Sequence, residues 1–340
     1  MKTFIDQKEA LRDYLNASVA QGHIPGAVLL VATSDRVLWK EAFGARQLVP
    51  TRLPMTEDTI FDIASVTKVA AALPAILHLI DQEMLEFDTT VGEVFGLDDS
   101  YPVAPIPLTE LLTHTAGLPL RTYVEQYGTD RAAILEGICR EPLEAERGTR
   151  VAYCNRGFVL LGMIAEQISG QPLDRYVTEH IWKPLGMHET FYNPPAHFLP
   201  RIAPTEYRDE LGACQHGTVH DESCAWMGGV AGHAGAFSTA DDLLRFCRMI
   251  LQKGGDVLRA ETVEKSLQIY THGLNDARGL GWDYFRKAGV FGHTGFTGTS
   301  IYLDPPRDLC CVFLTNRVHP TRESQHIHEI RRTVLGHVFG

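Results

Sequence analysis

The order of β-rich and helical segments along the chain limits the possible folds more than any other feature. Two β-rich runs, 26–33 and 36–43, lie near the N-terminus and predict a hairpin. Helical patterns follow to about residue 200, and strand-like runs return at 281–285, 299–303 and 309–315. This order predicts an α+β fold, in which both chain ends build one antiparallel sheet flanked by helices and an all-helical region is inserted between them.

The same pattern suggests how the chain is divided. We expect residues 1–60 and 225–340 to form the sheet region and residues 61–224 a mainly helical region. The two would form one catalytic unit, with the active site in the cleft between them, as is usual for enzymes. Pro74 should kink the first helix, because proline lacks a backbone donor. The predicted helices are 6–20, 66–84, 108–113, 131–140, 156–169, 173–183, 241–251 and 322–338.

Composition excludes several classes of partner. A net charge of −11 argues against nucleic acid or an anionic membrane as the main partner. The longest apolar run, 69–80, is about half a membrane span, so we expect no membrane span. Residues 1–15 show no secretory signal, although a leader removed earlier stays possible. The seven cysteines are odd in number and include no C-x-x-C pair, which favours reduced thiols and a cytoplasmic location.

The first candidate catalytic element is Ser65-Val66-Thr67-Lys68, at the predicted start of a helix. A spacing of three residues places the hydroxyl and the ammonium on one helix face, about one turn apart. Unpaired N–H groups at a helix N-terminus favour a developing oxyanion, and a desolvated lysine can activate a serine. About one S-x-x-K is expected by chance in a chain of this length, so the motif needs support from elsewhere.

The second element is Tyr153-Cys154-Asn155, just before the helix 156–169. Tyr153 and Asn155 are two apart in extended chain and therefore point to the same side. A lysine cation beside the phenol should lower its pKa and let it carry protons. A packed tyrosine followed by an asparagine helix cap is the alternative interpretation.

The third element is the heptapeptide 292–298, GHTGFTG, which leads into the strand 299–303. Its three glycines allow backbone to approach a ligand, and a strand edge offers N–H groups for an oxyanion hole. A glycine-rich hairpin turn would explain the glycines, but not the polar pair His293-Thr294.

Taken together and in this order, S-x-x-K, Y-x-N and H-T-G resemble the class C β-lactamases, D-alanyl-D-alanine carboxypeptidases and related esterases. The resemblance extends from about residue 26 to residue 316. Four further stretches are similar to the same family: FDIASVTK around Ser65, LLTHTAGLP at 111–119, FVLLG after Tyr153, and GGVAGHAGAFST at 228–239.

The resemblance implies a serine hydrolase that forms a covalent acyl-enzyme on ester or amide substrates. Ser65 would be the nucleophile, and Lys68 and Tyr153 would share the proton transfers, with the identity of the resting base left open. Asn155 would hold the lysine and the substrate amide. The remaining implied contacts are the strand motif His293, Thr294 and Gly295, and an oxyanion hole formed by the N–H groups of Ser65 and Phe296.

One departure from the family pattern concerns the substrate. Many lactamases and peptidases have lysine where this chain has His293, and that cation helps to bind a substrate carboxylate. Penicillin hydrolysis is therefore disfavoured, and Arg317 is a candidate replacement cation. The implied substrates are a small acyl ester, a peptide ending in a D-amino acid and a β-lactam, in that order, and no cofactor is implied.

Two rival interpretations remain. His216 and His220 are four apart and Asp221 follows, as in some metal-binding segments, but no H-E-x-x-H is present and we expect no metal. A catalytically weak penicillin-binding or sensor module of the same fold is the other alternative. Inactive relatives usually lose the serine, lysine or tyrosine, whereas this chain has all three. Nothing in the residues specifies an oligomeric state.

Overall fold

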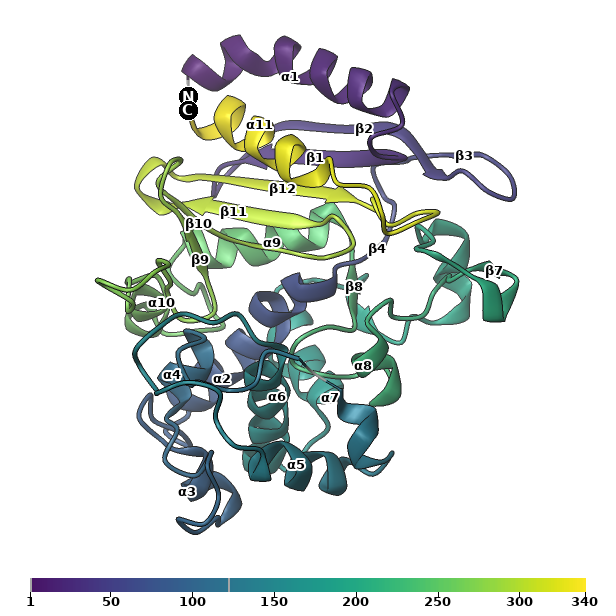
Figure 1. Ribbon diagram of the computed structural model, residues 1–340. Coiled ribbons are helices and arrows are strands. Elements are labelled where there is room, and N and C mark those ends of the chain that lie inside the picture. Colours follow the sequence, from purple (N-terminus) through teal and green to yellow (C-terminus); the bar gives the residue numbers. More distant parts are fainter. Residues whose placement is uncertain (1, 122) are drawn as a thin grey trace.

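A large antiparallel sheet confirms the predicted α+β fold class. The computed structural model describes residues 2–121 and 123–340. Its main sheet has seven strands in the order β3-β2-β1-β12-β11-β10-β9, so both ends of the chain contribute (Figure 1). These strands are β1 (Gly26–Ala32), β2 (Val37–Gln47), β3 (Leu53–Pro54), β9 (Asp283–Phe285), β10 (Val290–Thr294), β11 (Ser300–Asp304) and β12 (Leu309–Thr315).

Strand β1 lies in the middle of this arrangement and joins the two chain ends. Ala27 pairs with Phe43 of β2 on one side and with Thr315 of β12 on the other, both antiparallel. Leu29 and Val31 pack toward helices α1 (Lys2–Ala20) and α11 (Ile327–Phe339), which cover the outer face of the sheet (Figure 1). Alternate residues of β1 enter the core on the other face, so β1 is apolar throughout.

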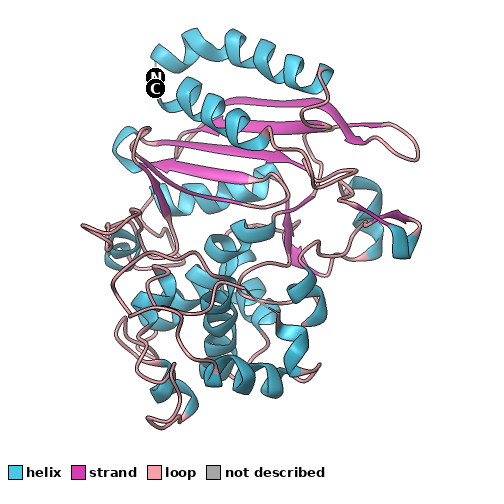
Figure 2. Ribbon diagram, in the orientation of Figure 1, coloured by secondary structure: helices cyan, strands magenta, loops and turns pink. Residues whose placement is uncertain are grey.

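The inner face of the sheet packs on helix α9 (Ala240–Leu251) and on the helical part of the chain (Figure 2). Two small sheets, β4-β8-β5 and β6-β7, lie within this part. The first of them pairs residues 61–62 and 191–192 with residues 236–238, which lie on the other side of the predicted boundary at residue 225. The division of the chain into a sheet region and a helical region stays a prediction. The elements here are β4 (Phe61–Asp62), α2 (Leu73–Asp81), α3 (Val91–Phe95), α4 (Leu108–Leu112), α5 (Arg131–Arg140), α6 (Asn155–Ser169), α7 (Leu173–Val177), β5 (Phe191–Tyr192), β6 (Tyr207–Arg208), β7 (Ala213–Cys214), α8 (Glu222–Trp226), β8 (Ala236–Ser238) and α10 (Ala260–Ser266).

The segment that follows β4 differs from the single kinked helix predicted over 66–84. It consists of a 3-10 turn η1 (Ala64–Val66), a π-helical turn η2 (Lys68–Ala72) and then α2. Pro74 lies where the π-helical turn continues into α2 without a break. The carbonyl of Ala70, which an N–H at position 74 would reach in an α-helix, accepts a hydrogen bond from Nε1 of Trp182 at 2.9 Å instead. The stretch Ala64–Asp81 has the length and composition of a membrane-crossing helix, but 83% of it is buried inside the protein.

The last helix begins later than the predicted residue 322. Arg322 is held outside the helix by ion pairs with Glu206 and Glu222, and Arg317 donates hydrogen bonds to the carbonyls of Arg322 and Ser324. These contacts satisfy the backbone of residues 322–324 in a non-helical path, and α11 starts at Ile327.

Candidate active site

Ser65 lies in a strained turn that is held by a buried carboxylate. The preceding residue, Ala64, has φ of 45°, a left-handed conformation that disfavours side chains by about 1–2 kcal/mol. Asp62 accepts hydrogen bonds from the N–H of Ala64 at 2.8 Å and from the N–H of His220 at 2.7 Å. Ser65 is thereby directed into a cavity of about 530 Å³.

Lys68 is fully buried beside the serine and contacts no carboxylate of the residues that the structure describes. Its Nζ lies 2.9 Å from Oγ of Ser65, 2.9 Å from Oδ1 of Asn155 and 3.2 Å from the carbonyl oxygen of His233. Burial lowers the pKa of Lys68 to about 7, because an ammonium group loses its hydration there. Near neutral pH the amine is therefore close to half deprotonated and can accept the Ser65 proton.

Tyr153 completes this group, but its pKa moves in the direction opposite to the prediction. Lys68 Nζ lies 4.9 Å from the Tyr153 ring centroid. Desolvation nevertheless raises the pKa of the Tyr153 phenol, and a hydrogen bond from Ser65 opposes this increase only in part. Tyr153 as a whole keeps 41% of its surface exposed. The predicted lowering is wrong because loss of water outweighs the opposing effects of the Ser65 hydrogen bond and the Arg278 charge on the phenol pKa. Tyr153 is thus a neutral phenol that can donate a proton.

The turn before α6 explains why Tyr153 and Asn155 reach the same lysine. Cys154 is extended, with φ of −143° and ψ of 133°, and occupies the N-cap position of the helix that begins at Asn155, without a side-chain capping hydrogen bond. The N–H of Cys154 donates to Nδ1 of the buried His114 at 3.2 Å, and the His114 ring lies 4.6 Å from the Tyr153 ring. His114 was not predicted as a site residue, although it belongs to the LLTHTAGLP stretch noted in the sequence.

The strand β10 forms the opposite wall of the cavity. His293 and Thr294 pair with Ile301 and Ser300 of β11, and Gly295 and Phe296 follow in the turn. His293 is buried, donates from Nδ1 to the carbonyl of Thr294 at 3.0 Å, and burial holds its pKa well below the usual value. At neutral pH this residue therefore supplies no positive charge.

Phe296 follows β10 in the turn beside Ser65, and its backbone N–H is unpaired within the described residues. Phe296 lines the cavity together with Ser65. Its carbonyl accepts a hydrogen bond from Nε of Arg317 at 2.8 Å. The oxyanion role of the Ser65 and Phe296 N–H groups stays a prediction.

Four arginines line this cavity, Arg278, Arg317, Arg322 and Arg331, and only Arg317 was predicted from the sequence as a site residue. Arg317 is close to Phe296, and its Nε and one terminal nitrogen are used by backbone carbonyls. Arg278 lies 5.6 Å from the Tyr153 ring centroid and forms ion pairs with Asp276 and Asp283. Arg331, from α11, also lines the cavity. Neither Arg278 nor Arg331 belongs to a recognisable motif.

The three residues considered for a metal have separate protein partners. His216 contacts the carbonyl of Ile202 at 3.0 Å, and His220 contacts Glu206 at 3.1 Å. Asp221 pairs with His233 at 2.9 Å. Within the described part of the chain, no group of three or more His, Cys, Asp or Glu side chains is placed to hold a metal ion.

Comparison with known proteins agrees with this geometry. The model of the β-lactamase family matches residues 11–335. This chain belongs to the β-lactamase family. A family relative named for D-alanyl-D-alanine carboxypeptidase activity, from Escherichia coli O157:H7, is 32% identical, with 93% of this chain and 83% of the relative covered. An N-acetylmuramyl-L-alanine amidase from Bacillus subtilis (strain 168) is 30% identical, with 90% and 80% covered.

The fold is also that of solved members of this structural group. EstCE1, described as a hydrolase with promiscuous acyltransferase activity, superimposes with a TM-score of 0.79 over 100% of this chain and 99% of its own, at 22% identity. With the family established, the protein is a serine hydrolase of ester or amide substrates.

Proposed function

We propose that Ser65 attacks an ester or amide carbonyl and that Lys68 is the resting base. The Ser65 oxygen bonds to the carbonyl carbon while its proton passes to the neutral Nζ of Lys68. The tetrahedral oxyanion is stabilised by the N–H groups of Ser65 and Phe296. Tyr153 donates its proton to the departing oxygen or nitrogen and regains one from Lys68. Water then attacks the acyl-enzyme along the reverse proton path.

The observation that carries this proposal is the environment of Lys68. Its Nζ is 2.9 Å from the Ser65 hydroxyl, is fully buried, and has only neutral oxygen acceptors around it. A structural lysine is normally paired with a carboxylate when it is buried. An unpaired buried amine with a pKa of about 7 is suited to general base catalysis instead.

Ester hydrolysis is the proposed primary activity, with cleavage of a peptide ending in a D-amino acid second and β-lactam hydrolysis third. The neutral His293 supports this order, because it lacks the cation with which β-lactam-hydrolysing relatives bind a carboxylate. The names of the 30–32% identical relatives support the peptide and amide candidates.

We also propose that the protein works in a reducing compartment such as the cytoplasm. All seven cysteines are free in the described structure, and six of them are buried in the core or beside the site. An oxidising compartment would place these thiols under selection for pairing or loss.

The test is intact-mass analysis and peptide mapping after incubation with a fluorophosphonate probe. We expect one adduct, on Ser65, that is absent in Ser65→Ala. Lys68→Ala and Tyr153→Phe should each slow labelling and ester hydrolysis by about 10²-fold or more. Labelling at another residue, or undiminished hydrolysis by Ser65→Ala, would show that the proposed nucleophile is wrong.

A further inference from the structure

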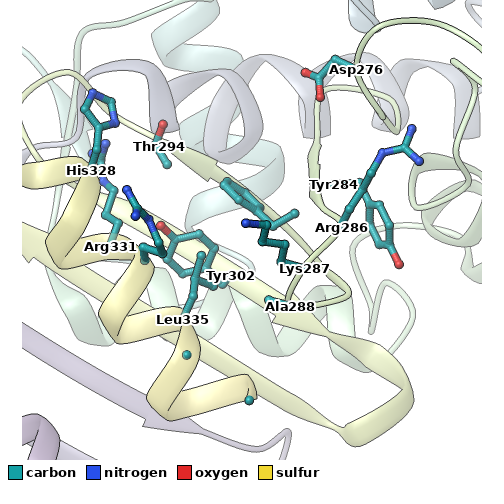
Figure 3. A pocket seen from close by; sticks show the side chains of 14 residues that line it. Asp276, Tyr284, Arg286, Lys287, Ala288, Thr294, Tyr302, His328, Arg331 and Leu335 are labelled. Carbon is teal, nitrogen blue, oxygen red and sulfur yellow. The ribbon is translucent and has the colours of Figure 1, made fainter.

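A second chamber adjoins the cavity that contains Ser65. It has a volume of about 600 Å³ and lies between α11 and the β9–β10 hairpin (Figure 3). The two spaces share three lining residues, Thr294, His328 and Arg331. The two spaces therefore adjoin at these three residues.

The chamber concentrates positive charge in a protein whose net charge is −11. Its lining includes Arg286, Lys287, Arg331 and Arg332, and none of these four forms an ion pair with any residue of the described ranges. The one acidic residue in the lining, Asp276, is paired with Arg278 at 3.1 Å. The chamber is therefore a local excess of uncompensated cations.

Arg331 is the most informative of these cations because it is fixed in place and incompletely satisfied. One of its terminal nitrogens donates to the carbonyls of Gly295 at 2.6 Å and Thr299 at 2.8 Å. The residue is only 8% exposed, and its buried Nε has no hydrogen-bond partner among the described residues. A buried guanidinium without a counter-charge is costly, and a bound anion would offset that cost.

The chamber lining also contains apolar side chains, interspersed with the cations. Figure 3 shows Arg331 and Leu335 extending from α11 toward Tyr302, with Lys287 across the space from them. Phe285 also contributes to the lining. A chamber lined by both cations and aromatic or aliphatic surface suits a ligand that carries an anionic group on an apolar stem.

We propose that this chamber is a substrate subsite that binds a carboxylate carried on an apolar chain, at a distance from the carbonyl that Ser65 attacks. The proposal rests on the proposed function of Ser65. Arg331 lies at the junction of the two spaces, and Lys287 and Arg332 hold the far carboxylate. The preferred substrates are accordingly esters whose acyl chain ends in a carboxylate.

The test compares matched p-nitrophenyl esters. Mono-p-nitrophenyl adipate, suberate and sebacate end in a carboxylate, and p-nitrophenyl hexanoate, octanoate and decanoate are their uncharged counterparts. The quantity measured is the ratio of kcat/KM between each charged ester and its neutral counterpart. Both kcat/KM values depend in the same way on the concentration of folded enzyme, so a loss of folded enzyme in a variant does not change their ratio.

We expect the wild-type ratio to exceed about fivefold for at least one chain length and to fall as ionic strength rises. Lys287→Glu and Arg332→Glu should each lower it by about fivefold. Lys183→Glu, which reverses an exposed lysine outside both cavities, is the matched control and should leave the ratio unchanged.

Failure of the subsite and failure of the proposed nucleophile give different results. If p-nitrophenyl hexanoate is hydrolysed in a Ser65-dependent manner but no charged ester is preferred at any length, the subsite is absent. A preference that survives both charge reversals also contradicts it. If hydrolysis does not depend on Ser65, the proposed function itself is wrong and the subsite is rejected with it.

Discussion

Arg317 donates a hydrogen bond from Nε to the carbonyl of Phe296 at 2.8 Å, and its guanidinium carbon lies 4.3 Å from the centroid of the Phe296 ring. The same arginine donates from a terminal nitrogen to the carbonyls of Arg322 and Ser324. A guanidinium used in this way orients the turn that presents the Phe296 N–H. We therefore regard Arg317 as a positioning residue for the proposed oxyanion hole, instead of the substitute substrate-binding cation that the sequence suggested.

Arg317→Met should lower kcat for a neutral ester by about 10- to 100-fold with little change in KM, because an oxyanion donor acts mainly on the transition state. Arg317→Lys should rescue little, since a single ammonium cannot reproduce the planar set of hydrogen bonds. Steady-state kinetics on p-nitrophenyl hexanoate would measure both. A loss confined to carboxylate-bearing esters would instead return Arg317 to the role of a binding cation.

The lowered pKa of Lys68 predicts the pH dependence of the reaction. The base must be neutral, so kcat/KM for an uncharged ester should rise with pH and level off above about pH 7. Lys68→Arg keeps the charge but cannot deprotonate, and it should lose at least about 10²-fold at every pH. The pH profile of wild type, measured at constant ionic strength, is the check. A rising limb near pH 10 would contradict Lys68 as the resting base.

Local patterns account for the parts of the structure that the sequence predicted well. Helix α5 spans Arg131–Arg140, as predicted, because Asp130 caps it by accepting from the N–H of Ala133 and its apolar residues recur at helical spacing. The antiparallel sheet from both chain ends followed from strand-length apolar runs. Lys68 Nζ lies 2.9 Å from Oγ of Ser65 and 2.9 Å from Oδ1 of Asn155. The resemblance of S-x-x-K and Y-x-N to the family motifs led us to expect that these residues lie together.

The parts that the sequence could not predict depend on long-range packing. Arg278 reaches Tyr153 from a loop 125 residues later in the chain, and Arg331 reaches the cavity only because α11 packs across the sheet. The pKa of Tyr153 was predicted in the wrong direction, because desolvation is set by the whole surrounding fold and not by the nearest charge. Neither effect leaves a local pattern.

Asp62 should make stability depend on pH in an unusual direction. Burial raises its pKa to about 6, so the folded protein binds a proton more tightly than the unfolded chain, whose value is near 3.8. The contribution of Asp62 to stability is therefore greatest below about pH 4 and falls by up to about 3 kcal/mol as pH rises through 6.

Asp62→Asn removes this titration while keeping one acceptor for the N–H groups of Ala64 and His220. We expect it to destabilise the protein by about 1–3 kcal/mol at acid pH, with a smaller difference from wild type at pH 7. Urea unfolding of both proteins at pH 4.5 and pH 7 measures that difference. If the difference in the free energy of unfolding between the two proteins is constant or increases from pH 4.5 to pH 7, Asp62 is ionised in the folded protein at both pH values.

Gly295 should tolerate no side chain, because it packs directly against the nucleophile turn. A Cβ at this position would lie 2.5 Å from the carbonyl oxygen of Ile63 and 3.3 Å from Cβ of Ala64. Gly295→Ala must therefore separate β10 from Ser65, and we expect at least about a tenfold loss of kcat together with about 1–3 kcal/mol of stability. Gly336→Ala is the matched stability control: its Cβ meets no atom within 4 Å, and an alanine within α11 should stabilise by about 0.5–1 kcal/mol. Thermal unfolding and ester kinetics on both variants measure the losses of stability and of kcat. A Gly295→Ala enzyme with wild-type kcat would show that the distance between β10 and Ser65 is not critical.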